Sequence, residues 1–326
     1  MLYPLFFNPI FKDRIWGGRM LGQLYHKPLP EGSVIGESWE LVDRKDENSV
    51  VANGPLAGST LRSLMNGRRD ELLGGAKDLD GRFPLLIKIL DARETLSVQV
   101  HPPASKAAAL GGEPKTEMWY VADASPEAEI YAGLRKGVTQ SQFEQSIHNG
   151  TVQECIHRVP VTAGDAMFLP SGRVHALGGG TVIFEVQQNS DTTYRVFDWN
   201  RRDPATGQPR ELHIEKSLAS IDFEDFEPGL LSRNTRAEDG YSVRTLVKND
   251  LFEVELLELN QESSAVFVLH QARIFNVVEG AVRIESHQGV WGAAAGSTCL
   301  VPAGCGPVKL TATGQARVLK TVPGNG

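Results

Sequence analysis

The chain has 326 residues, of which 41% are hydrophobic and 22% are charged. This length is typical of about two domains, and the composition provides enough apolar residues to bury a sizeable core, so intrinsic disorder is not expected. The formal net charge of −7, without any long run of like charges, argues against nucleic acid as a partner.

The number of cysteines and the length of the apolar segments indicate in which cellular compartment we expect the protein. Three cysteines, Cys155, Cys299 and Cys305, are too few for a disulfide framework, so we expect free thiols in a reducing compartment. No segment approaches the roughly 18 apolar residues that a membrane-spanning helix requires. The apolar segment 1–14 lacks a basic start and a small-residue cleavage site. We therefore expect a soluble cytoplasmic protein whose N-terminus packs on the fold.

Most periodic segments are short, rich in Val, Ile, Phe and Tyr, and separated by Gly, Pro, Asp and Ser, which is typical of β-strands. Strands are predicted, in chain order, at 84–92, 95–102, 117–124, 128–134, 165–170, 181–187, 192–199, 241–247, 251–259, 265–270, 273–285 and 299–304. Helices are predicted at 60–74, 138–150 and 211–221. So many short strands favour an all-β sandwich or barrel.

An acidic, turn-rich stretch at 222–240 separates two groups of predicted strands. We interpret it as the connection between two domains. The predicted division is a first domain at 1–240 and a second, smaller domain at 241–326.

One sequence frame occurs twice. Residues 164–175 read Gly-x5-Pro-x-Gly-x-x-His, and residues 296–307 read Gly-x5-Pro-x-Gly-x-x-Pro. The second copy therefore has Pro307 where the first has His175. Because proline has no side-chain atom that can bind a metal, this part of the second copy is unsuited to a metal site.

A second element repeats in the same order. The segment that begins at Glu117 is similar to the one that begins at Arg273. A guanidinium is always cationic and repels a metal ion, whereas a carboxylate binds one. The sequence thus predicts two similar β-folds, with a metal site in the first only.

The first frame resembles the second signature of the cupin family, whose fold is a jelly-roll barrel. Gly172 would turn the chain and place His175 on the next strand, pointing inward. The family's first signature normally offers His-x-His and then Glu, and this chain has Gln99 and His101 followed by Glu117. Residues two apart on a strand share a face, so these side chains can converge on one ion. Such nitrogen and oxygen donors suit Zn2+ and also accept Fe2+ or Mn2+.

Several ordered blocks narrow the resemblance. Residues 84–102, 115–121 and 185–199 are similar to type I mannose-6-phosphate isomerases in their short bacterial form. The likeness begins near residue 3, runs to about residue 216, and continues more weakly into the C-terminal part. It implies an all-β fold of two cupin-type jelly-roll barrels with a few short helices. It also implies interconversion of D-mannose 6-phosphate and D-fructose 6-phosphate with one Zn2+ per chain.

The resemblance also implies roles for individual residues. The family's metal ligands correspond to Gln99, His101, Glu117 and His175. Its catalytic arginine corresponds to Arg195, and its substrate-binding serine and lysine correspond to Ser97 and Lys115.

These residues suit the implied chemistry. An aldose–ketose isomerisation moves a proton between C1 and C2 through an enediol or enediolate, so negative charge builds on the sugar oxygens. A metal ion and the permanent cation of Arg195 both stabilise such charge. The group that carries the proton stays open among Lys115, Asp191, Glu185 and a zinc-bound water.

Three of these residues could instead have an ordinary structural role. Arg195 could form a surface ion pair with Asp191 or Asp198, Lys115 could be a solvated loop residue, and Ser97 could be a plain strand hydroxyl. The competing functions are isomerisation of another phosphorylated or free sugar and non-catalytic sensing of a sugar. The second barrel could pack against the first or form the contact of a homodimer.

Overall fold

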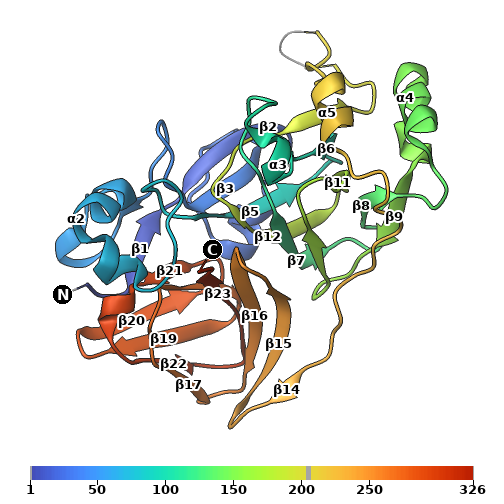
Figure 1. Ribbon diagram of the computed structural model, residues 1–326. Coiled ribbons are helices and arrows are strands. Elements are labelled where there is room, and N and C mark those ends of the chain that lie inside the picture. Colours follow the sequence, from blue (N-terminus) through green and yellow to red (C-terminus); the bar gives the residue numbers. More distant parts are fainter. Residues whose placement is uncertain (1, 203–206, 326) are drawn as a thin grey trace.

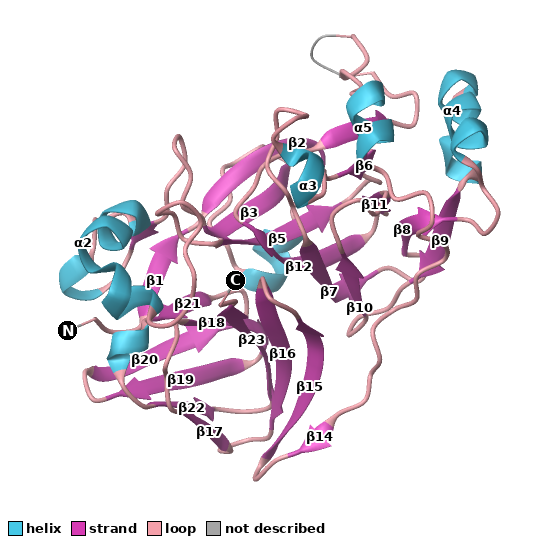
Figure 2. Cartoon of the chain, in the orientation of Figure 1, coloured by secondary structure: helices cyan, strands magenta, loops and turns pink. Residues whose placement is uncertain are grey.

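The computed structural model describes residues 2–202 and 207–325, which form two β-barrels packed side by side (Figure 1). Strands dominate and the helices are few and short (Figure 2). The expected all-β fold of two cupin-type barrels is therefore confirmed. In the described part of the chain, no helix combines the length and apolarity needed to cross a membrane.

The first barrel consists of two sheets. The six-stranded sheet has the order β10 (Ala166–Leu169), β7 (Glu117–Ala124), β12 (Thr181–Gln188), β5 (Leu85–Ala92), β3 (Ile35–Leu41) and β2 (Ile10–Gly18). The five-stranded sheet has the order β13 (Tyr194–Phe197), β6 (Val98–Val100), β11 (His175–Leu177), β8 (Glu129–Leu134) and β9 (Ile156–Pro160).

The second barrel repeats this plan. Its eight-stranded sheet has the order β14 (Arg236–Ala237), β15 (Tyr241–Lys248), β16 (Phe252–Leu259), β23 (Ala316–Pro323), β18 (Arg273–Glu279), β21 (Thr298–Val301), β1 (Leu5–Asn8) and β4 (Val50–Val51). Its four-stranded sheet has the order β17 (Ser264–Phe267), β22 (Val308–Ala312), β19 (Ala281–Ser286) and β20 (Gly289–Ala294).

The start of the chain lies in the sheet of the second barrel. Strand β1 pairs with β21, where Leu5 is opposite Leu300, and its other side pairs with β4. The N-terminal segment thus packs on the fold through main-chain hydrogen bonds as well as apolar side chains. The division at residue 240 stays a prediction, and β1 and β4, from the start of the chain, belong to the eight-stranded sheet of the second barrel.

The three predicted helices are present. The segment 60–74 forms α2 (Leu61–Leu73), which begins after Thr60, whose side chain accepts a hydrogen bond from the Ser63 amide. The segment 138–150 forms α4 (Gln140–Asn149), and a capping box of Thr139 and Gln142 begins it. The segment 211–221 forms the shorter α5 (Ile214–Ser220).

Two further α-helices, α1 (Met20–Tyr25) and α3 (Ala104–Ala107), were not predicted. Neither has a capping side chain of its own, so the local sequence carries no start signal. Asp91 of strand β5 instead accepts a hydrogen bond from the Met20 amide at 2.6 Å. This contact takes the place of a local cap at the start of α1. Three short 3₁₀ segments, η1 (Gly54–Leu56), η2 (Val152–Glu154) and η3 (Ala303–Cys305), complete the described secondary structure.

The alternation of side chains on β5 decides which residues face the site. Ile87 and Ile89 belong to the large apolar core that also contains Phe252 and Val254 of the second barrel. Lys88 and Leu90 therefore point to the opposite side, into the first barrel. The second barrel thus covers the outer face of the six-stranded sheet and leaves its inner face for the site.

Candidate metal centre and adjoining cavity

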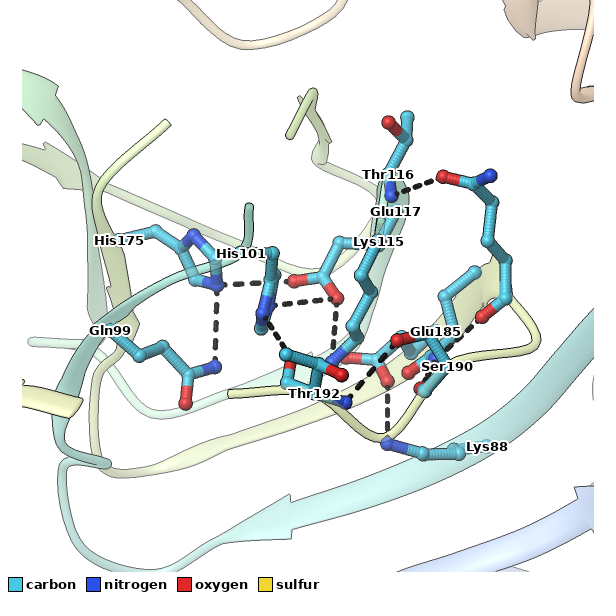
Figure 3. A network of polar contacts seen from close by, with 12 residues as sticks. Lys88, Gln99, His101, Lys115, Thr116, Glu117, His175, Glu185, Ser190 and Thr192 are labelled. Carbon is cyan, nitrogen blue, oxygen red and sulfur yellow. Dashed lines mark hydrogen bonds and ion pairs between the residues drawn. The ribbon is translucent and has the colours of Figure 1, made fainter. Parts of the chain in front are cut away.

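Three of the predicted metal ligands meet inside the first barrel (Figure 3). One ligand atom from each of His101, Glu117 and His175 lies within 4.8 Å of the other two. Glu117 Oε1 is 3.2 Å from His175 Nε2, and Glu117 Oε2 is 3.6 Å from His101 Nε2. All three side chains are buried. The arrangement is a cluster of two imidazoles and one carboxylate that could hold a metal ion.

Neighbouring strands bring these residues together. Strand β11 pairs with β6 so that His175 is opposite Gln99, and His101 follows directly after β6. Glu117 is the first residue of β7. The turn before β11 passes through Gly172 with φ of +94°, a conformation that glycine adopts without strain. The Gly-Pro frame therefore positions His175 in the way the sequence indicates.

Main-chain carbonyls orient both imidazoles. His101 Nδ1 lies 2.8 Å from the Thr192 carbonyl oxygen, and His175 Nδ1 lies 2.9 Å from that of Arg173. Because a carbonyl only accepts, each Nδ1 carries the proton and each Nε2 presents a lone pair to the cluster. Burial, with the charge of Lys115, lowers the pKa of His101 to about 3. His101 is thus a neutral imidazole, the form that binds a metal.

The buried polar atoms fit a bound cation. His101 Nε2 and both carboxylate oxygens of Glu117 are buried without any hydrogen-bond partner in the described chain. Buried polar groups are nearly always satisfied, and apart from the Lys115 ammonium near Glu117 these atoms are free to coordinate a cation. Gln99 Nε2 lies 3.3 Å from His175 Nε2, and half a turn of the amide would present its oxygen to the ion instead.

Lys115 is buried rather than solvated. Only 4% of its surface is exposed, and its Nζ lies 3.1 Å from Glu117 Oε2. Burial alone would raise the pKa of Glu117, but the charge of Lys115 and the contacts with the two histidines hold that pKa well below its usual value. Glu117 is therefore a carboxylate.

Arg195 faces the site and not a surface acid. It lies on β13 opposite Gln99, and its Nε donates to Ser97 Oγ at 3.3 Å. A second donor, Nη1, bonds the Glu211 carbonyl at 2.8 Å. Among the described residues it forms no ion pair, because Arg201 and Arg210 occupy Asp198. Arg195 and Ser97 are thus held together beside the metal cluster.

A second buried charge network lies beside the cluster, and sequence reasoning identified only one of its members. Lys88 Nζ is 3.1 Å from Glu185 Oε1 and 3.6 Å from Glu37 Oε2. Trp119 donates to Glu185 at 3.0 Å, and Trp39 donates to Glu37 at 2.6 Å. The available signal was Lys88 within the apolar run 85–90, because a lysine among buried apolar residues is usually paired with an acid.

These groups line one cavity of about 280 Å³, a size suited to a small molecule. Ser97, Arg195 and Arg210 contribute to its wall, and so do Gln99 and Lys115 from the side of the metal cluster. Asp191, one of the candidates for the proton carrier, also lines it, and so does Arg14, which was assigned no role from sequence. All seven sequence-predicted site residues thus lie either in the cluster or in the wall of the adjoining cavity.

Comparison with known proteins agrees with this geometry. Residues 5–144 match the family described as phosphomannose isomerase type I, catalytic domain. The chain is 39% identical over 316 residues to mannose-6-phosphate isomerase ManA of Bacillus subtilis (strain 168), covering 94% of this chain and 95% of that protein. It is 42% identical over 219 residues to a mannose-6-phosphate isomerase of Streptococcus mutans, covering 67% of each.

The fold is likewise similar to a solved structure. The crystal structure of the mannose 6-phosphate isomerase from Bacillus subtilis superposes with a TM-score of 0.88 at 31% sequence identity. The match covers 98% of this chain and 99% of that chain, so both barrels take part in it.

Proposed function

The chain belongs to the type I mannose-6-phosphate isomerase family, and we propose that it interconverts D-mannose 6-phosphate and D-fructose 6-phosphate with one bound Zn2+. The observation that carries the proposal is the buried cluster of His101, Glu117 and His175, whose unpartnered atoms lie beside a cavity lined by arginines. Gln99 completes the proposed ligand set.

The charges around the cavity support one orientation of the substrate. Arg195 and Arg210 both line it, and the acid that pairs with Arg210, Asp198, is shared with Arg201. This end of the cavity is therefore rich in cations. The phosphate of a sugar phosphate would bind here, against Arg195 and the Ser97 hydroxyl. Lys115 lies instead against Glu117, so we propose that it acts near the reacting end of the sugar.

The reaction transfers a proton between C1 and C2 while charge develops on the sugar oxygens. Bound Zn2+ supplies Lewis-acid stabilisation of that charge. Arg195 contributes a fixed cation that costs no reorganisation, because Ser97 and the Glu211 carbonyl already orient it.

Three side chains lining the cavity are candidates for the proton-carrying group. Glu185 is engaged on both oxygens, by Lys88 and by Trp119. Asp191 is exposed, lines the cavity, and makes no hydrogen bond or ion pair with the described residues. Lys115 is held by Glu117. Asp191 and Lys115 are therefore the first two residues to replace in a search for the base.

The test is a coupled assay of fructose 6-phosphate formation from mannose 6-phosphate, before chelation, after chelation, and after addition of Zn2+. We expect activity to disappear with the metal and to return with zinc. Full activity after verified metal removal would refute the metal mechanism.

The same assay with free mannose separates the competing functions. We expect free mannose to react far more slowly, because it lacks the group that the arginines bind. Activity on a different sugar only would point to another isomerase on this scaffold. No activity of the metal-loaded protein on any sugar tested would favour a sensing role.

A further inference from the structure

The second barrel has an open sheet edge at a place where the first barrel has one more strand. Strand β17 ends the four-stranded sheet and pairs with β22 only. It lies at the lower margin of the molecule in Figure 1. Its counterpart in the first barrel, β6, pairs with β11 on one side and with β13 on the other. Within residues 2–202 and 207–325, no strand occupies the place beside β17 that β13 occupies beside β6.

Apolar side chains accompany this open edge. Val266 and Val268 are each 64% exposed, the highest values among the exposed large hydrophobic side chains of the described chain. On the corresponding strand of the first barrel, Val98 and Val100 are fully buried, in a cluster that includes Tyr194 of β13. The covering that β13 provides in one barrel is therefore missing in the other.

The edge also lacks the features that usually prevent edge-to-edge pairing. Natural edge strands are protected by charged side chains, prolines or bulges. Strand β2 has Lys12 and Arg14, and β9 has Arg158 and Pro160. The segment 264–269, which is β17 and the two residues after it, reads Ser-Ala-Val-Phe-Val-Leu, without charge or proline, and β17 itself pairs with β22 without a bulge.

We propose that this edge joins two copies of the chain, with β17 and the two residues after it, 264–269, pairing antiparallel with the same segment of the second copy across a two-fold axis. The segment is nearly symmetric about Phe267, so Val266 of one copy lies opposite Val268 of the other, twice in each dimer. A two-fold interface needs this self-complementarity, and no like charges face each other in it. The two four-stranded sheets then form one continuous sheet. Because one short strand buries little area, the dimer is weak and depends on concentration.

The test is sedimentation velocity over a concentration series, with the double variant V266K/V268K. Wild type should pass from monomer to dimer as its concentration rises. The variant should dimerise at least about tenfold more weakly, because lysines would face each other across the new strand pair. V290K is the matched control, since Val290 is 61% exposed on β20 at the opposite edge of the same sheet. Circular dichroism and thermal unfolding confirm that each variant is folded.

A cross-linking experiment tests the register. A mixture of V266C and V268C chains should form disulfide-linked dimers faster than either chain alone, and the three native cysteines are buried. The proposal is overturned if wild type stays monomeric throughout the series, in which case the edge is free for a different protein. It is also overturned if V290K weakens the dimer as much as V266K/V268K does.

Discussion

The two barrels share a strand order but differ in what lies on their inner faces. The order β10-β7-β12-β5-β3-β2 of the first barrel is matched by β21-β18-β23-β16-β15-β14 of the second. Glu117 begins β7 and Arg273 begins β18. His175 pairs with Gln99 at the start of β11, whereas Val308 pairs with Phe267 at the start of β22. A few side chains thus decide whether the same backbone can hold a metal.

Both barrels have a cross-strand ion pair at the same place, but the acidic and basic residues have changed strands. In the first barrel Lys88 is opposite Glu185 across β5 and β12, and in the second Glu255 is opposite Lys320 across β16 and β23. Both pairs form ion pairs. A buried cross-strand ion pair is therefore compatible with either barrel and is not by itself a mark of catalysis. What distinguishes the first barrel is the pairing of this network with unpartnered metal-binding atoms.

The largest expected effect comes from removing the carboxylate that the second barrel lacks. Glu117→Gln should lower kcat/KM at least about a thousandfold and abolish stoichiometric metal binding, because the cluster loses its only charged ligand. The coupled assay and metal analysis measure both quantities. Arg273→Gln, at the matching place in the second barrel, should change neither. A Glu117→Gln variant with normal metal content and activity would contradict the assigned site.

The ion pairs of Lys88 and Lys320 should contribute differently to the free energy of unfolding. Lys88 is placed between two buried carboxylates, and Lys88→Met leaves Glu185 without a cationic partner while Glu37 keeps Arg14, so it should lower the free energy of unfolding by about 3–5 kcal/mol. Lys320→Met leaves Glu255 paired with Arg236 and should cost clearly less. Urea unfolding of the two variants measures the difference. Equal losses would show that the two networks are energetically equivalent.

Arg195 lies on β13, the strand without a counterpart in the second barrel. Arg195→Ala should reduce kcat/KM by about a hundred- to a thousandfold while metal content stays normal, because a fixed cation facing the substrate is lost. Arg236→Ala, which removes an ion-paired arginine of the second barrel, serves as control. A catalytically silent Arg195→Ala variant would favour the sensing function over catalysis.

The smallest effect concerns acid stability. Burial opposes ionisation of Glu37, but Lys88, Arg14 and the Trp39 hydrogen bond lower its pKa to about 2 from 4.5. A carboxyl whose folded-state pKa is lowered stabilises the protein above its unfolded pKa. That stabilisation is lost as pH falls from 4.5 through 2. Unfolding measured at pH 7 and near pH 2 should show wild type losing about 3 kcal/mol more than Glu37→Gln. Parallel pH profiles would rule out this contribution.

Local sequence signals predicted much of the fold. The alternation of apolar residues located strands such as 181–187 and 117–124, and capping residues located α2 and α4. The repeated Gly-Pro frame identified which barrel could hold a metal. The helix α1 escaped prediction because Asp91, about seventy residues away in sequence, provides its first hydrogen bond.

The sequence by itself determined which donor side chains come together, because spacing on a strand and the Gly-Pro turn fix which side chains share a face. It also predicted that the second barrel lacks this metal site, since arginine and proline are not ligands. Only the tertiary structure decided that Lys115 neutralises Glu117, that Lys88 bridges Glu37 and Glu185, and that β1 completes the second barrel. Those contacts join residues far apart in the chain, and their strength depends on burial that no local pattern records.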